Sequence, residues 1–109
     1  MNFKLLFAAG ILAASVGIAQ GDAANAAQTI HVSAKNFMFS PATITVKAGV
    51  TVTWVNFDEE PHTVFSDTGL FRSSALDTKE SFSYTFDKPG THHYLCTIHP
   101  RMIGTIIVE

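Results

Sequence analysis

Alternation of apolar and polar residues, broken at short intervals by Gly, Pro, Asn and Asp, is the feature that most restricts how this chain can fold. In the run from residue 50 to 55, for example, Val50, Val52 and Trp54 share one side. A two-residue period is that of a β-strand with one buried face, and no stretch keeps a 3.6-residue apolar period for about ten residues. The predicted strands are residues 29–34, 43–47, 50–55, 81–86, 91–96 and 103–108, and residues 67–79 are predicted to form a loop.

Short strands separated by frequent turn residues predict an all-β fold, an antiparallel β-sandwich of about seven to eight strands. We expect a single domain over residues 27–109, because a stretch of this length carries one hydrophobic core. The sandwich alone does not predict a function, since this architecture hosts many unrelated activities.

The first 26 residues have the order of a secretory signal peptide. Lys4 precedes the uncharged apolar run Leu5–Ala19, and small residues follow, so we expect cleavage near residues 21–27, with Ala24-Asn25-Ala26 as a suitable site. An uncleaved membrane anchor is the alternative, but the run is shorter than the roughly 20 residues that a spanning helix needs. The sequence therefore predicts export to the periplasm, with membrane attachment only if this segment is retained.

Cys96 is the only cysteine, so the predicted exported domain cannot form an internal disulfide. Domains this small bury little apolar surface and often rely on a metal for additional stability. The net charge of −2 lacks the excess of basic residues that nucleic acids require, so no nucleic-acid partner is expected. The acidic run Asp58–Glu60 is expected to be a solvated loop, with a basic partner protein as the less favoured interpretation.

The segment between the last two predicted strands carries the chemistry. Cys96, His99 and Met102 recur at every third residue of one loop, which can direct a thiolate, an imidazole and a thioether to one point. Soft sulfur donors with imidazole select copper, and two histidines, one cysteine and a weak axial methionine make a type 1 electron-transfer site. His62 follows an acidic turn at the start of an apolar stretch and is the best candidate for the second histidine.

Each of these residues has an ordinary explanation when it is considered alone. Cys96 could be a small core residue, Met102 a core filler, and a single histidine a surface group. Their combination in one short loop of a chain with one cysteine favours a metal site holding one copper ion that alternates between Cu(II) and Cu(I). Zinc accepts Cys and His but seldom Met, and a cysteine nucleophile would need a base and an oxyanion site that the sequence does not offer.

Several runs of the chain resemble the cupredoxins, most closely their amicyanin and plastocyanin group. The resemblance extends from about residue 29 to residue 108 and includes Phe39–Gly49, Val52–Asn56 leading to His62, and Lys88–Thr91. It ends with the Cys-x-x-His-x-x-Met loop, which is the short ligand loop of amicyanins. The resemblance implies a Greek-key sandwich, a type 1 copper bound by the four predicted ligands, and electron shuttling in the periplasm.

The sequence departs from the family pattern at five positions. Ile98 and Arg101 stand where amicyanins have Pro and Phe, and Thr63 stands where many cupredoxins have an Asn that ties the two ligand loops together. Thr63 could still donate a hydrogen bond to that end. His92 replaces a frequent Tyr, and Leu95 removes the aromatic residue that gives plastocyanins a second electron exit.

The sequence therefore predicts a small exported type 1 copper protein that carries one electron at a time and is not an enzyme. Its partners are expected to be transient redox proteins, and the protein is expected to be a monomer. Two other functions remain open, namely copper binding and trafficking in the periplasm, and a metal-free structural sandwich. The low methionine content argues against trafficking, because only three Met residues occur and one of them is Met1.

Overall fold

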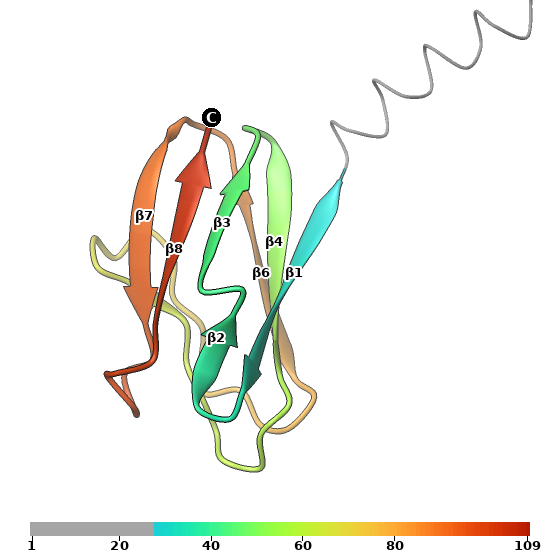
Figure 1. Ribbon diagram of the computed structural model, residues 1–109, viewed down its shortest axis with the longest axis vertical. Helices are drawn as coiled ribbons and strands as arrows, with labels where there is room; N and C mark the ends of the chain where they lie inside the picture. Colours follow the sequence, from blue (N-terminus) through green and yellow to red (C-terminus); the bar gives the residue numbers. More distant parts are fainter. Residues whose placement is uncertain (1–27) are drawn as a thin grey trace, which may run out of the picture.

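The computed structural model describes residues 28–109, so the predicted signal peptide lies outside the described residues. The described chain is built from strands, and within it no helix could cross a membrane. The eight strands, shown in Figure 1, are β1 (Thr29–Lys35), β2 (Met38–Ser40), β3 (Thr43–Val46), β4 (Val50–Asn56), β5 (Phe65–Ser66), β6 (Ser81–Phe86), β7 (Gly90–Leu95) and β8 (Ile103–Val108).

Two four-stranded sheets pack face to face, which confirms the predicted β-sandwich. One sheet has the order β2-β1-β4-β6 and the other has the order β3-β8-β7-β5 (Figure 1). The strand number lies at the upper end of the predicted range, and the predicted loop at residues 67–79 is irregular apart from isolated bridges.

The sheets are mixed and not purely antiparallel as predicted, because each sheet contains one parallel pair. β1 runs parallel to β4, with Ile30 opposite Val52, and β3 runs parallel to β8, with Ile44 opposite Ile106. The chain reverses between β1 and β2, moves to the other sheet without reversing, and reverses again before β4 (Figure 1). Because the chain reverses twice, β4 runs in the same direction as β1. The sequence did not predict this, because a two-residue period indicates which face of a strand is buried but not the direction of the neighbouring strand.

The alternating residues of β4 form the centre of the core. Val50, Val52 and Trp54 are buried, as their shared side predicted. The indole of Trp54 stacks on Phe71 and meets the ring of Tyr94 edge-on, at centroid distances of 5.6 Å and 5.4 Å. The strands β2 and β5 were not predicted, because runs of three and two residues are too short to show alternation.

Gly104 of β8 lies directly opposite Tyr94 of β7 and allows the tyrosine ring to cross the sheet surface. A Cβ atom at this position would overlap the ring of Tyr94, so the glycine is required by packing. Burial raises the pKa of Tyr94 to about 12, which keeps the phenol neutral inside the core.

Candidate metal centre

Three segments distant in sequence meet at one end of the sandwich. They are the β1–β2 turn, the segment between β4 and β5, and the β7–β8 loop, all at the lower end of Figure 1. The backbone N–H of Phe57 donates to the carbonyl of Ala34 at 2.8 Å and joins the first two segments. Hydrogen bonds of the Thr63 hydroxyl with the backbone N–H and the hydroxyl of Thr97 join the second and third segments.

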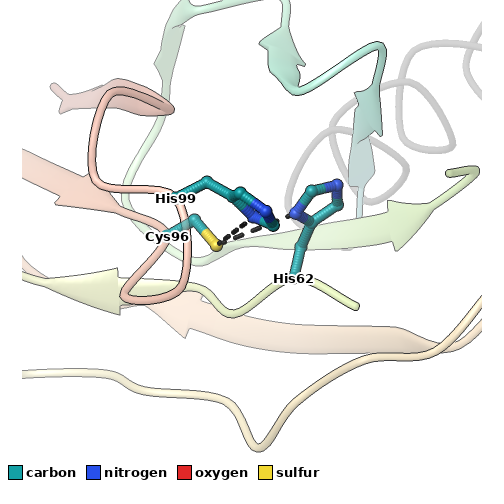
Figure 2. A group of neighbouring side chains, drawn as sticks. All are labelled: His62, Cys96 and His99. Carbon is teal, nitrogen blue, oxygen red and sulfur yellow. Dashed lines mark hydrogen bonds between the residues drawn. The ribbon is translucent and has the colours of Figure 1, made fainter. Parts of the chain in front are cut away.

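His62, Cys96 and His99 come together at this end, as the sequence predicted. One potential ligand atom from each of them lies within 4.8 Å of the other two. The Cys96 sulfur is 3.8 Å from Nδ1 of His62 and 3.9 Å from Nδ1 of His99, and Figure 2 shows the three side chains pointing toward one another. Cys96 and His62 are 0% and 1% exposed, so their donor atoms are buried, whereas His99 is partly exposed.

Met102, the fourth predicted ligand, is buried beside this group with 2% exposure. The loop closes on itself, because the Cys96 N–H donates to the Met102 carbonyl at 3.0 Å and the Met102 N–H donates to the His99 carbonyl at 2.9 Å. These two bonds fold residues 96–102 into a tight turn that places the backbones of all three loop donors side by side. Met102 also shares the lining of one surface hollow with His99.

Two opposing effects determine the charge of Cys96. Burial raises the pKa of the thiol. Hydrogen bonds from the Thr63 N–H, from the side chain and backbone of His99 and from the His62 side chain outweigh burial and lower the pKa to about 6. The Thr63 N–H donates to the sulfur at 3.4 Å, as expected for this residue. The thiolate, which is the form that binds metals, is therefore favoured at neutral pH even before a metal is bound.

Thr63 performs the connecting role that was expected of it. Its hydroxyl oxygen accepts a hydrogen bond from the Thr97 N–H at 2.7 Å and lies 2.8 Å from the Thr97 hydroxyl. The segment that carries His62 is thereby attached to the loop that carries Cys96. A threonine can therefore replace the usual asparagine without separating the two loops.

The acidic run Asp58–Glu60 was expected to be a solvated loop, which is correct for Glu59 and Glu60 but wrong for Asp58. Its Oδ2 atom is 2.8 Å from Nε2 of His62, the ring nitrogen that faces away from the cysteine. Its two carboxylate oxygens also accept hydrogen bonds from the backbone N–H groups of Asn36 and Phe37, at 2.7 Å and 2.9 Å. Burial raises the pKa of Asp58, but the hydrogen bonds from Phe37, His62 and Asn36 lower it by more, so the carboxylate stays ionised.

No pattern in the sequence indicates the role of Asp58, because a separation of four residues in a loop does not determine whether two side chains meet. A carboxylate on the outer nitrogen of a metal-binding histidine fixes the orientation of the ring and the position of its proton. The bond from Nε2 to Asp58 leaves the Nδ1 atom of His62, which faces Cys96, free to bind a metal through its lone pair. The predicted ligand therefore has the support that metal-binding histidines ordinarily have.

The donor chemistry of this end fits copper. A buried thiolate, two imidazoles and a neighbouring thioether are the set that selects a type 1 copper ion over harder metals. A strand sandwich with such a set at one end defines the class of cupredoxins, the small blue-copper proteins.

The chain belongs to the Cupredoxin-like domain family, which it matches over residues 7–108. It is similar to the amicyanin of Paracoccus versutus, with 34% identity over 88 residues that span 76% of this chain and 67% of that protein. Plastocyanin of Scenedesmus fuscus is 39% identical over 85 residues, 66% of this chain and 87% of that protein. The structure of an amicyanin mutant with Cu(I) has a TM-score of 0.71 at 31% identity, covering 74% of this chain and 82% of that chain.

Proposed function

We propose that this protein is an exported one-electron carrier that holds a single copper ion through His62, Cys96, His99 and Met102. The observation that supports it best is the convergence of one sulfur and two imidazole nitrogens within 4.8 Å, from two buried residues and one partly buried residue. Amicyanin and plastocyanin, to which the chain is similar over most of its described length, are electron carriers. Bound copper would supply a couple that exchanges one electron.

Each proposed ligand has a distinct role. Cys96 would hold copper as a thiolate, His62 and His99 would hold it through imidazole nitrogens, and Met102 would supply a weak thioether donor that tunes the potential. The hydrogen bonds of Thr63 and Asp58 hold the cysteine and the first histidine in place without the metal. Because the donors are positioned in advance, a change of oxidation state requires little movement of the protein.

The surface around His99 is suited to brief contacts with redox partners. Three large apolar side chains are exposed beside this end, with exposed fractions of 47% for Phe37, 47% for Ile98 and 63% for Ile103. Arg101 is exposed among them and adds one positive charge. A small exposed apolar surface suits the small interfaces that are typical of weak electron-transfer complexes. We therefore propose transient redox proteins as partners of a periplasmic monomer.

Replacement of Cys96 tests the proposal. Purified protein with Cu(II) should show an intense visible band from thiolate-to-copper charge transfer and the EPR spectrum of a type 1 site. Cys96→Ser should abolish the band, and a matched Ser81→Ala variant, changed at an exposed hydroxyl of β6, should keep it. A visible band that survives in the serine variant would exclude Cys96 as a ligand. Rapid loss of copper to a weak chelator with slow electron self-exchange would favour copper trafficking instead.

A further inference from the structure

His99 has less hydrogen-bonding support than the other proposed histidine ligand. The outer nitrogen of His62 is fixed by Asp58 at 2.8 Å. Within residues 28–109, the His99 ring has one polar contact, which joins its Nδ1 to the Cys96 sulfur at 3.9 Å. A metal-binding histidine usually needs a second contact to fix its ring orientation. Contacts with other rings are what can hold this ring, and one of them is with His62 at a centroid distance of 5.0 Å.

The ring of Phe37 is placed to do so. It meets His99 edge-on with a centroid distance of 4.9 Å and an interplanar angle of 76°. It also meets His62 at 5.5 Å and 85°. Phe37 is 47% exposed, so one side of its ring rests on the two imidazoles and the other faces solvent. Aromatic pairs in this edge-on geometry stabilise each other beyond the area they bury.

The position of Phe37 requires an unfavourable backbone. Asn36 and Phe37 form the two-residue turn between the paired residues Lys35 and Met38, with φ angles of 55° and 59°. Turns with two positive φ angles favour Asn at the first position and Gly at the second. A bulky residue with positive φ is an outlier that persists only where surrounding structure holds it. The turn therefore keeps a side chain where glycine would be preferred.

Asp58 supplies the holding contacts. Its carboxylate accepts hydrogen bonds from the N–H groups of both turn residues, at 2.7 Å and 2.9 Å. Asp58 is itself restrained, because its N–H donates to Oδ1 of Asn56 at 2.8 Å and its carbonyl accepts from the Thr78 hydroxyl at 2.6 Å. One carboxylate thus contacts His62 directly and fixes the turn that places a phenyl ring on His99.

We propose that Phe37 is a positioning residue for His99, and that its ring contact takes the place of the hydrogen bond that the imidazole lacks. Asp58 keeps the phenylalanine in this position against the preference of its backbone. The inference rests on the proposed function in so far as His99 is taken to be a copper ligand. It assigns to one aromatic side chain the task of ordering His99 before copper binds and of maintaining copper affinity afterwards.

Two substitutions of Phe37 separate the ring from the backbone strain. Phe37→Leu removes the ring and keeps the strain, whereas Phe37→Gly removes both. Phe57→Leu is the matched control, because Phe57 is also 47% exposed and has no ring contact with either histidine. Three properties are measured for each variant: the denaturant midpoint of the metal-free protein, the NMR linewidths of the His99 ring, and the copper affinity by chelator competition.

Both Phe37 variants should lose about tenfold in copper affinity, the lower end of what removal of a ligand-orienting group causes. Their metal-free His99 ring signals should show exchange broadening, and Phe57→Leu should match the wild type. Phe37→Gly should unfold at a higher denaturant concentration than Phe37→Leu, because it relieves the positive φ. Wild-type affinity and sharp His99 signals in both Phe37 variants would overturn the proposal. Failure of the wild type to bind copper would refute the proposed function, while the metal-free NMR comparison would still test Phe37.

Discussion

At the scale of single residues, Cys96 shows how a buried group can still favour its charged form. Burial opposes ionisation, but the Thr63 N–H and the two histidine side chains stabilise the thiolate, and the pKa of Cys96 falls to about 6. The same contacts that prepare the sulfur for copper therefore make the metal-free protein sensitive to pH.

We expect the metal-free protein to gain stability as pH rises from about 6 to about 9. The folded thiol loses its proton near pH 6, whereas the unfolded thiol keeps it up to its ordinary pKa of about 8.5, so the unfolded state binds more protons between them. The stabilisation is complete above the unfolded pKa and is lost as pH falls through the folded one. Denaturant unfolding at several pH values would measure the slope. Subtraction of the Cys96→Ser curve removes the histidine contributions, and identical curves would contradict the prediction.

At the scale of elements, the β1–β2 hairpin depends on a contact from outside itself. β2 has three residues, and its connecting turn has two positive φ angles with a phenylalanine at the second. An isolated hairpin of this size is marginal in water. The Asp58 carboxylate, which follows β4, satisfies both N–H groups of the turn and therefore stabilises the hairpin from the neighbouring segment.

Asp58→Asn should lower the free energy of unfolding of the metal-free protein by about 1–3 kcal/mol, because one of the two acceptor oxygens becomes an NH2 group that cannot accept a hydrogen bond from the turn. Amide hydrogen exchange should accelerate at residues 36–38 more than in β7 or β8. Glu59→Gln is the control, since Glu59 is exposed and should tolerate the change. Uniform exchange rates with unchanged unfolding would show that the turn does not depend on the carboxylate.

At the scale of the whole molecule, the metal centre links the two layers of the sandwich. His62 lies on the segment that leaves β4 in one sheet and enters β5 in the other, and Cys96 and His99 lie between β7 and β8. A metal ion that binds these side chains joins segments about thirty residues apart. Such a link matters in a domain this small, which has little apolar burial to spare.

Copper should therefore raise the unfolding temperature of the wild type in a concentration-dependent way. Free copper at a hundredfold excess over its dissociation constant would add about 2.7 kcal/mol to the free energy of unfolding, provided that the unfolded chain does not bind it. Calorimetry with and without copper would measure this shift, and Cys96→Ser should lose most of it. Equal unfolding temperatures for the wild type would instead favour a metal-free structural sandwich.

The sequence by itself determined the longer strand segments and the candidate donor set, and it did not indicate β2 or β5. The two-residue period in β4 and β6 is that of a strand with one buried face. The donors Cys96, His99 and Met102 can be recognised in the sequence because they are regularly spaced in one short loop. Only the tertiary structure decided the parallel pairings, the carboxylate of Asp58 on His62 and the ring of Phe37 on His99. The parallel pairings and the ring contact depend on which segments become neighbours after the chain has crossed between sheets. The carboxylate contact depends on the path of the loop between β4 and β5. Local patterns of polarity determine neither.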